Sequence, residues 1–180
     1  MKIIKTSISG LFIIEPKIFL DERGYFYESY NKEEFYKNSL DADFTQDKES
    51  KSNKGVLRGL HYQTGEFAQD KLVRVSYGAV LDVAVDIRED SPTYGQYESV
   101  LLSGENQKMF YIPKGFAHGF VSLKDGTIFN YKCSNVYNKD AEGSILWNDE
   151  VLDIKWHVDS PLLSDKDKIA PKFGEHVKSN

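Results

Sequence analysis

The feature that most constrains this chain is a series of short runs in which apolar and polar residues alternate. The clearest run, Val-Leu-Asp-Val-Ala-Val-Asp-Ile at residues 80–87, predicts a half-buried strand with apolar side chains on one face and aspartate and alanine on the other. Similar runs lie at residues 11–15, 24–30, 72–76, 97–102, 109–112, 119–123 and 127–133. Many short strands separated by turn residues are typical of a β-sandwich or barrel, so we expect an all-β fold.

Helical signals are confined to residues 32–40. Asn31 precedes this segment as a candidate N-cap, and Glu34 stands three residues later as its capping-box partner. No repeat, low-complexity tract or linker divides the 180 residues, a length that suits one domain. We expect a single domain over residues 1–180, with the helix on its periphery, a packed arm after Asp149 and a flexible tail at about residues 174–180.

The charge balance argues against nucleic acid as a partner. Lys and Arg number 23 against 28 Asp and Glu, a net charge of −5, although a few arginines could still hold a phosphate. Cys133 is the only cysteine and cannot form an internal disulfide. The first residues lack the apolar stretch of a signal peptide, and no apolar run approaches the ~20 residues that cross a bilayer. We therefore expect a cytoplasmic protein without a membrane partner.

Two of the four histidines stand in contexts that suggest function. His61 ends the segment Val-Leu-Arg-Gly-Leu-His, where strand alternation puts Arg58 and Leu60 on the face opposite His61 unless Gly59 hosts a β-bulge. His118 follows a turn-forming proline and glycine that would deliver it to the start of a strand. Taken alone, a histidine on a strand is more often structural than catalytic.

Other residues of reactive type have plainer interpretations. His157 and His176 lie in the polar C-terminal part, and we expect them at the surface. Cys133 alternates with Phe129 and Tyr131 on one strand face and has no evident basic partner, so an inert, packed thiol is expected.

The spacing Pro113-x-Gly115-x-x-His118 resembles the second half of the cupin signature, which implies an all-β, cupin-type jelly-roll barrel with short peripheral helices. The cupin metal site uses two closely spaced histidines in its first half, but Gln63 stands where the second would be. Two isolated histidines fall short of the three protein ligands of a catalytic zinc site. We therefore expect no metal.

Several motifs in order along the chain carry a more specific resemblance. They are Asp-Glu-Arg-Gly (21–24), Gln-Asp (46–47), Val-Leu-Arg-Gly-Leu-His (56–61), Lys-Leu-Val-Arg (71–74), Asp-Val-Ala-Val-Asp (82–86), Ile-Pro-x-Gly-Phe-Ala-His-Gly-Phe (112–120), Tyr-Lys (131–132) and Trp-Asn-Asp (147–149). From about residue 10 to 171 the sequence resembles the dTDP-4-dehydrorhamnose 3,5-epimerase family.

The resemblance implies epimerisation at C3 and C5 of dTDP-4-dehydro-6-deoxy-D-glucose, through an enolate and without any cofactor. By similarity His61 is the base, Tyr131 the acid across the sugar, and Lys71 a cation near the C4 oxygen. Asp167 matches the carboxylate that pairs with the catalytic histidine. Inversion needs a proton to leave one face of the carbon and another to arrive on the opposite face.

The resemblance also implies substrate contacts around this centre. Arg23 and Arg58 match residues for the diphosphate, and Phe19 or Tyr137 could stack on thymine. Further matched positions are Phe26, Glu28, Gln46, Asp47, His118, Glu142 and Lys166, the last depending on whether Lys166 or Lys168 is aligned. The family implies a homodimer in which an N-terminal strand brings Arg23 and Phe26 to the partner's site.

One residue departs from the family pattern. Members usually have Asn where this chain has Lys48, after Gln46 and Asp47. If Lys48 points at the substrate, it could tighten diphosphate binding or alter the nucleotide or sugar preference; if it points outward, the change is neutral. The sequence does not decide between these.

Three other functions remain as alternatives at this point. An enzyme that inverts only C3 of a related nucleotide-linked 4-keto sugar would use the same base. A sugar-nucleotide-binding cupin without catalysis is opposed by the presence of His61, Lys71 and Tyr131 together. A metal-dependent cupin oxygenase is opposed by Gln63 at the histidine position.

Overall fold

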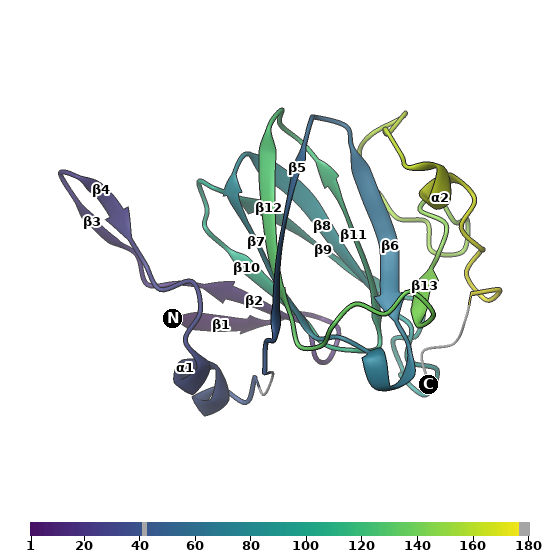
Figure 1. The fold of residues 1–180 in the computed structure, drawn as a ribbon, viewed down its shortest axis with the longest axis horizontal. Coiled ribbons are helices and arrows are strands. Elements are labelled where there is room, and N and C mark those ends of the chain that lie inside the picture. The colour runs from purple at the N-terminus through teal and green to yellow at the C-terminus, as the bar shows by residue number, and fades with distance from the viewer. Residues whose placement is uncertain (41–42, 177–180) are drawn as a thin grey trace.

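The computed structural model describes residues 1–40 and 43–176, and most of its strands form two antiparallel sheets that face each other (Figure 1). The six-stranded sheet has the order β1 (Lys2–Lys5), β2 (Phe12–Glu15), β10 (Met109–Ile112), β7 (Lys71–Tyr77), β12 (Thr127–Cys133) and β5 (Gln46–Ser52). The five-stranded sheet has the order β13 (Glu142–Ser144), β6 (Leu57–Gln63), β11 (Phe116–Ser122), β8 (Ala79–Asp86) and β9 (Tyr97–Ser103). This is the expected all-β, cupin-type jelly-roll barrel.

The barrel interior is filled by aromatic and β-branched side chains from both sheets. Phe110, Phe116, Phe120 and Phe129 are buried in one cluster, and the rings of Phe120 and Phe129 stack with centroids 4.2 Å apart. Each such side chain stabilises the fold by roughly 1.5–3 kcal/mol relative to its exposed state. Phe120 and Phe129 also line a cavity, so the apolar core ends where the cavity begins.

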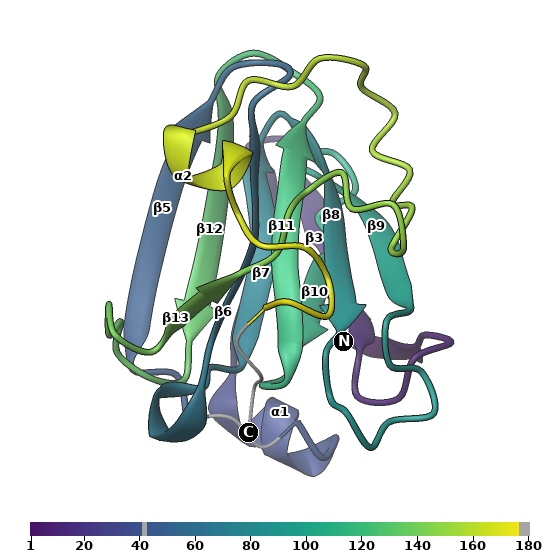
Figure 2. The ribbon, with the colours of Figure 1, turned by 90° about the vertical axis from the view of Figure 1, so that its right-hand side faces the viewer.

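The outer face of the five-stranded sheet is covered by the C-terminal arm, which crosses it in yellow in Figure 2. Trp156 and Leu152 from this arm are buried against Leu60 and Val83 in a second apolar cluster. Backbone hydrogen bonds fix the arm to β6: the Leu57 N–H donates to the Leu162 carbonyl at 3.0 Å. The arm is therefore part of the sheet packing rather than an appendage.

This covering makes one prediction wrong. The predicted strand is present as β8 (Ala79–Asp86), but it is not half-buried, because the arm covers its apolar face and the barrel interior encloses the other face. Asp82 and Asp86 are both fully buried. The burial of each carboxylate is tolerated because it has polar partners. Asp82 binds His118, and Asp86 accepts hydrogen bonds from Arg88, Ser91 and Thr93.

The helix predicted at residues 32–40 is shorter than expected. Helix α1 (Lys32–Lys37) begins as expected, since the Asn31 side chain accepts a hydrogen bond from the Glu34 N–H, and it buries Phe35. It ends three residues early, followed by Ser39 in the left-handed region at φ 60°. A second helix, α2 (Asp165–Lys168), and the 3₁₀ turn η1 (Gly65–Phe67) were not predicted.

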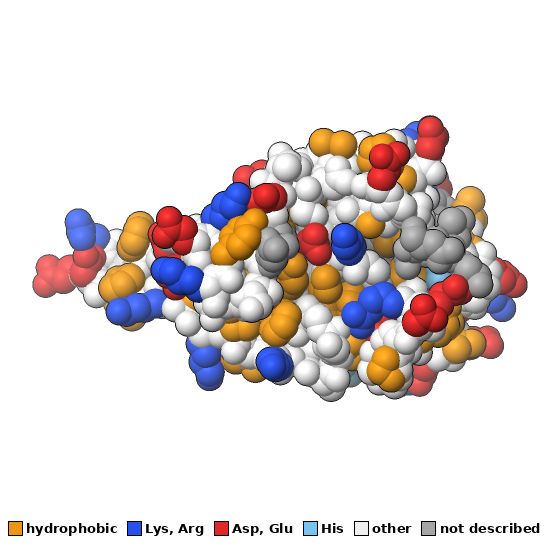
Figure 3. Space-filling view, turned by 90° about the horizontal axis from the view of Figure 1, so that it is seen from below, with side chains coloured by type: hydrophobic (Ala, Val, Ile, Leu, Met, Phe, Trp, Pro, Cys, Tyr) orange, Lys and Arg blue, Asp and Glu red, His pale blue; other side chains and the backbone are white. Residues whose placement is uncertain are grey.

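A β-hairpin projects from the barrel. It consists of β3 (Phe19–Asp21) and β4 (Gly24–Phe26), so only the first part of the strand predicted at 24–30 exists. Figures 1 and 3 show it extending away from the body of the molecule, with charged side chains at its tip. Its apolar side chains are exposed; Leu20 retains 80% and Phe26 70% of its accessible surface.

The C-terminal end differs from expectation in one respect. His157 is exposed as expected, but the prediction of a surface position for His176 is wrong, because its ring is buried between Phe173 and Tyr62. His176 is thus packed, and 177–180 of the expected flexible tail lie outside the described residues. In the described part of the chain, none of the helices has the length and apolar character needed to cross a membrane.

Candidate active site

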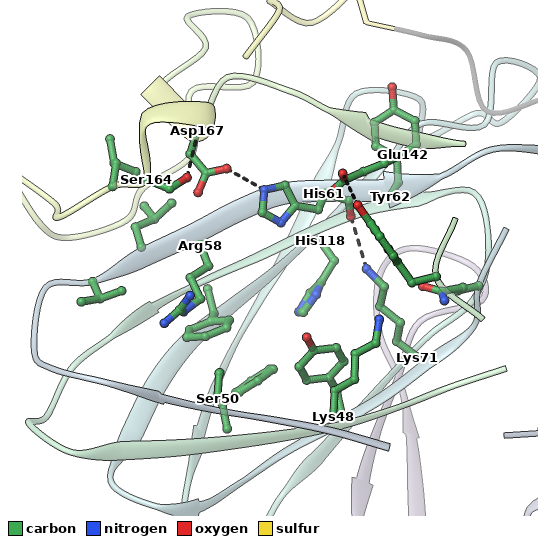
Figure 4. A pocket seen from close by; sticks show the side chains of 18 of the residues that line it. Lys48, Ser50, Arg58, His61, Tyr62, Lys71, His118, Glu142, Ser164 and Asp167 are labelled. Carbon is green, nitrogen blue, oxygen red and sulfur yellow. Dashed lines mark hydrogen bonds and ion pairs between the residues drawn. The ribbon is translucent and has the colours of Figure 1, made fainter. Parts of the chain in front are cut away.

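A cavity of about 540 Å³ lies between the two sheets (Figure 4). Both sheets and the C-terminal arm contribute to its wall, so it forms only when segments distant in sequence come together. Eight of the expected site residues line it, namely Lys48, Arg58, His61, Lys71, His118, Tyr131, Glu142 and Asp167. Tyr137, one candidate for stacking on thymine, lines it as well.

A β-bulge in β6 brings Arg58 and His61 to the same cavity. In the pairing with β11, His61 lies opposite His118 and Arg58 opposite Phe120, so β6 holds one extra residue between the pairs. The prediction from simple alternation, which put Arg58 on the face opposite His61, is therefore wrong. Gly59 permits the bulge because its φ is +136° and an added Cβ would lie 2.5 Å from the Gly119 Cα.

His61 is oriented by a carboxylate from α2. Its Nε2 lies 2.6 Å from Asp167 Oδ1, and Ser164 caps the helix by accepting a hydrogen bond from the Asp167 N–H. Burial by itself raises the pKa of Asp167, but hydrogen bonds from His61 and Ser164 outweigh it and hold the pKa below its ordinary value. An ionised Asp167 accepts the Nε2 proton, which leaves Nδ1, directed toward the cavity in Figure 4, as the basic nitrogen.

Lys71 lies on β7 with its ammonium group directed into the cavity. Its Nζ donates a hydrogen bond to the His61 carbonyl oxygen at 3.3 Å. Burial lowers the pKa of Lys71, and the like charge of Lys48 lowers it further, whereas Cys133, Asp82 and Glu142 act in the opposite direction. A cation whose charge is poorly solvated interacts strongly with any negative charge that forms nearby.

Tyr131 lies on β12, in the sheet opposite His61. Its ring packs on Phe129 with centroids 5.8 Å apart, and burial raises the pKa of its phenol above the ordinary 10.0. The nearby Arg58 acts in the opposite direction on this pKa. Tyr131 therefore keeps its proton at neutral pH and can donate it. The expected common face of Phe129, Tyr131 and Cys133 is confirmed, and Cys133 is a buried free thiol.

His118 has a buried carboxylate partner that the sequence analysis missed. Both oxygens of Asp82 lie 3.0 Å from His118 Nε2. Burial raises the pKa of Asp82 and lowers that of His118, so it disfavours the charged form of each. Asp82 was missed because alternation put it on the polar face of residues 80–87; an aspartate in an otherwise apolar strand was the signal available.

Polar side chains from three segments connect at the edge of the cavity. The Tyr137 hydroxyl donates to Glu142 Oε2 at 3.0 Å, and Lys166 Nζ lies 2.5 Å from the same carboxylate. Lys168 instead pairs with Asp165 on α2, so only Lys166 reaches the cavity wall. Gln63, at the position of the absent histidine, is held by hydrogen bonds to Phe67, Val136 and Asn138 and orders the neighbouring loops.

The remaining expected site residues lie outside the cavity of this chain. Arg23 and Phe26 are on the projecting hairpin with Phe19, and Arg23 pairs there with Asp21. Glu28 is exposed and accepts a hydrogen bond from Asn31. Asp47 points to the outer face of β5, where it binds Lys132, while Gln46 has a buried Oε1 without a partner among the described residues.

Within residues 1–40 and 43–176, no three His, Cys, Asp or Glu side chains are grouped closely enough to hold a metal ion. His61 and His118 each pair with a different carboxylate, Asp167 and Asp82 respectively.

Comparison with known proteins identifies close relatives over nearly the whole chain. Residues 5–175 match the family described as dTDP-4-dehydrorhamnose 3,5-epimerase. The enzyme of that name from Salmonella typhimurium is 54% identical over 173 residues, which cover 95% of this chain and 94% of the relative.

Solved structures agree in fold. The dTDP-4-dehydrorhamnose 3,5-epimerase of Elizabethkingia anophelis superimposes with a TM-score of 0.93 at 51% identity, covering 97% of both chains. The dTDP-6-deoxy-D-glucose-3,5-epimerase of Legionella pneumophila, solved with dTDP-4-keto-L-rhamnose, gives a TM-score of 0.92 at 50% identity and covers 95% of this chain and 92% of the other.

Proposed function

The chain belongs to the dTDP-4-dehydrorhamnose 3,5-epimerase family, and on that premise we propose how its own residues divide the chemistry. The protein is an isomerase that converts dTDP-4-dehydro-6-deoxy-D-glucose into dTDP-4-dehydro-L-rhamnose by inverting C3 and C5. The observation that carries the proposal is the placement of a carboxylate-bound histidine and a protonated tyrosine on opposite sheets of one cavity. His61 is on β6, and Tyr131 is on β12.

His61 acts as the base. The protons on C3 and C5 are acidic because both carbons adjoin the C4 ketone, and Nδ1 takes a proton while the C–H electron pair moves onto the C4 oxygen. Asp167 accepts the Nε2–H and stabilises the imidazolium that forms. Each proton transfer by a positioned base contributes about 10²- to 10⁴-fold to the rate.

Lys71 stabilises the enolate oxygen. Its ammonium projects into the cavity beside His61 and has no carboxylate partner among the described residues, so its charge is available for the substrate. The ketone of the substrate is itself the electron sink, and the proposed mechanism uses no metal or organic cofactor. Dialysis against a chelator should therefore leave the activity unchanged; loss of activity that zinc or iron restores would contradict this.

Tyr131 supplies the proton to the opposite face of the carbon. Burial keeps its phenol protonated, and its strand faces the strand of His61 across the barrel. Removal of a proton on one side and delivery on the other inverts the configuration. After one inversion His61 is an imidazolium and Tyr131 a phenolate, because the proton that left the carbon is on His61 and the proton that arrived came from Tyr131. Loss of a proton from His61 to solvent and gain of one by Tyr131 return both groups to their starting states.

Arg58 and His118 are further contacts for the substrate in the cavity. We assign Arg58 to the diphosphate because, within residues 1–40 and 43–176, its guanidinium has only the Ser52 hydroxyl as a hydrogen-bond partner, at 3.2 Å, and Arg58 remains exposed. His118 is a contact for the sugar, with Glu142 and Lys166 at the edge of the cavity. Phe19 or Tyr137 offers its ring to the thymine.

The hairpin supports a homodimer. Phe19, Leu20, Tyr25 and Phe26 expose apolar surface, and Arg23 lies in the turn between β3 and β4, on a hairpin that extends away from the barrel (Figure 1). A second copy of the chain would cover these side chains and receive Arg23, Phe26 and Glu28 at its own site, with Gln46 and Asp47 near the contact. We place the enzyme in the cytoplasm, whose reducing conditions suit the free thiol of Cys133.

Deuterium incorporation tests the reaction. In heavy water the purified protein should label both C3 and C5 of the dTDP-linked 4-keto-6-deoxy sugar, as read by NMR, while forming the L-rhamnose configuration. Label at C3 alone would show a 3-epimerase. Binding of dTDP without any exchange would show a sugar-nucleotide-binding protein that lacks catalysis.

A further inference from the structure

Lys48 occupies a position in the cavity that the proposed mechanism does not use. It lies on the inner face of β5, directly opposite Tyr131 in the β5–β12 pairing. Its ammonium lies 5.7 Å from the centroid of the Tyr131 ring and 5.5 Å from that of Tyr137. Two aromatic faces hold the charge there without neutralising it.

The carboxylates around the cavity are engaged elsewhere. Asp167 binds His61, Asp82 binds His118, and Glu142 binds Lys166 and Tyr137. Among residues 1–40 and 43–176, neither Lys48 nor Lys71 forms an ion pair with a carboxylate. Both lysines in the cavity therefore lack an anionic partner among the described residues, and a bound substrate can provide one.

Lys48 belongs to the same side of the cavity as Lys71. Figure 4 shows both side chains extending toward the same region, with Arg58 on the far side of His118. The electrostatic contact between the two lysines agrees with this placement, since Lys48 disfavours the charged form of Lys71. Lys48 therefore lies on the side of the cavity where Lys71 and Tyr131 are proposed to act, and Arg58 lies away from it.

We propose that Lys48 is a second cation for the enolate and, with Lys71, stabilises the negative charge that develops on the C4 oxygen. This inference rests on the proposed function, because it assumes the carbon-acid reaction. When the C–H bond breaks, the proton goes to His61 and the electron pair goes to the carbonyl oxygen; Lys48 forms no covalent bond and keeps its protons.

Two roles for Lys48, stabilising the enolate and binding the diphosphate, can be distinguished by measurements on the same protein. A cation that acts on the enolate lowers the barrier to proton removal, so its loss reduces exchange even when the enzyme is saturated with substrate. A cation that binds the diphosphate acts equally on bound dTDP, so its loss weakens dTDP binding.

The test compares Lys48→Met with the wild-type enzyme. Methionine has a similar length and can still pack against the two tyrosine rings, but it carries no charge. Lys51→Met is the matched control, because Lys51 lies on the same strand, is exposed and does not line the cavity. Hydrogen–deuterium exchange at C3 and C5 is measured by NMR at saturating substrate, and dTDP affinity is measured by calorimetry.

We expect Lys48→Met to slow exchange at saturation by at least about tenfold, as for loss of one charge-stabilising donor. The Kd for dTDP should stay within about threefold of wild type. Unchanged exchange at saturation, with either a weaker or an unchanged Kd, would overturn the proposal; the weaker Kd would identify a diphosphate contact.

A fold control keeps the result interpretable. If Lys48→Met melts well below the wild type, Lys48→Gln replaces it, with the same two measurements and the same criteria. Failure of the proposed function itself would look different, because the wild type would then show no exchange in the same assay.

Discussion

His61 Nε2 and Asp167 Oδ1 lie 2.6 Å apart although 106 residues separate them in the chain. The contact exists because the C-terminal arm first packs on the outer face of the five-stranded sheet and then turns back as α2 at the cavity. The same arm therefore completes the apolar packing of that sheet and orients the proposed base. Packing and catalysis are coupled through this segment.

Asp167→Asn should lower kcat strongly while leaving dTDP affinity unchanged. The amide occupies the same volume but carries no charge to stabilise the imidazolium, so we expect a loss of about 10²- to 10⁴-fold. Steady-state kinetics and calorimetric titration with dTDP measure the two effects. A variant with wild-type kcat would remove Asp167 from the mechanism.

Asp167 also predicts a pH dependence of stability. Its pKa in the folded protein lies below the ordinary 3.8, so the unfolded chain binds this proton more tightly. The stabilisation by the ionised carboxyl is complete above pH 3.8 and is lost as pH falls through the folded-state pKa. In thermal melts, the wild type should have a higher Tm than Asp167→Asn at neutral pH. This difference in Tm should disappear as pH falls through the folded-state pKa of Asp167. A constant difference would contradict the prediction.

His61 and Tyr131 should be distinguishable by exchange. His61→Asn should abolish both deuterium exchange and product formation, by at least about 10²-fold. Tyr131→Phe removes only the proton donor on the opposite face, so some exchange through His61 should persist while net epimerisation is suppressed. NMR of the keto sugar in heavy water reads both quantities, and dTDP binding by each variant shows that the site is intact. Full exchange in His61→Asn, or wild-type epimerisation in Tyr131→Phe, would contradict these roles.

Lys71→Met should stabilise the protein while it abolishes activity. Burial holds the pKa of Lys71 below the ordinary 10.5, which means that its charge opposes folding. Removing this penalty should raise Tm, by roughly 2–4 °C for each 1 kcal/mol regained in a chain of this size. The gain should shrink as pH rises through the folded-state pKa of Lys71 toward 10.5. A lower Tm for Lys71→Met than for wild type at neutral pH would refute this account.

Alternation of residue types predicted the fold class, but it did not predict which faces of each strand are buried. The alternation in residues 80–87 is that of a strand with one solvent-exposed face, yet Asp82 and Asp86 are fully buried. Their burial depends on His118 and Arg88, supplied by neighbouring strands and turns. Alternation within one segment carries no information about these partners, whereas the capping residue of α1, Asn31, could be predicted because its contact is local.

The candidate active site, too, could be predicted only in part, because some of its features depend on contacts between distant segments. His61 and Tyr131 stood out through motifs that resemble a known family. The shared face of Arg58 and His61 could not follow from alternation, because it depends on the extra residue of the bulge in β6. The direction of Lys48 was open until β12 was placed beside β5, which puts it opposite Tyr131.

Gly59→Ala should destabilise the protein much more than Gly55→Ala. Both glycines have positive φ, but an added Cβ at Gly59 would lie 2.5 Å from Gly119 Cα, whereas Gly55 has open space around it. Strain and overlap together should cost Gly59→Ala about 3 kcal/mol or more, against about 1 kcal/mol for strain at Gly55. Urea unfolding monitored by tryptophan fluorescence measures both free energies. Equal losses would mean that the bulge has no special steric demand.

The proposed dimer predicts complementation between two inactive variants. His61→Asn damages the barrel of a chain, and Arg23→Ala with Phe26→Ala damages its hairpin. If each hairpin serves the partner's cavity, a heterodimer of the two variants has one site in which barrel and hairpin are both intact. It should show about half of the wild-type activity, since a symmetric dimer has two equivalent sites.

The matched control pairs His61→Asn with Lys71→Met, two barrel variants whose heterodimer should stay inactive because each site keeps one defect. Heterodimers are isolated through two different affinity tags, and light scattering gives their mass. No recovered activity in the first heterodimer would mean that the hairpin does not serve the partner's site. A mass of 20.6 kDa for the active wild-type enzyme would exclude the dimer altogether.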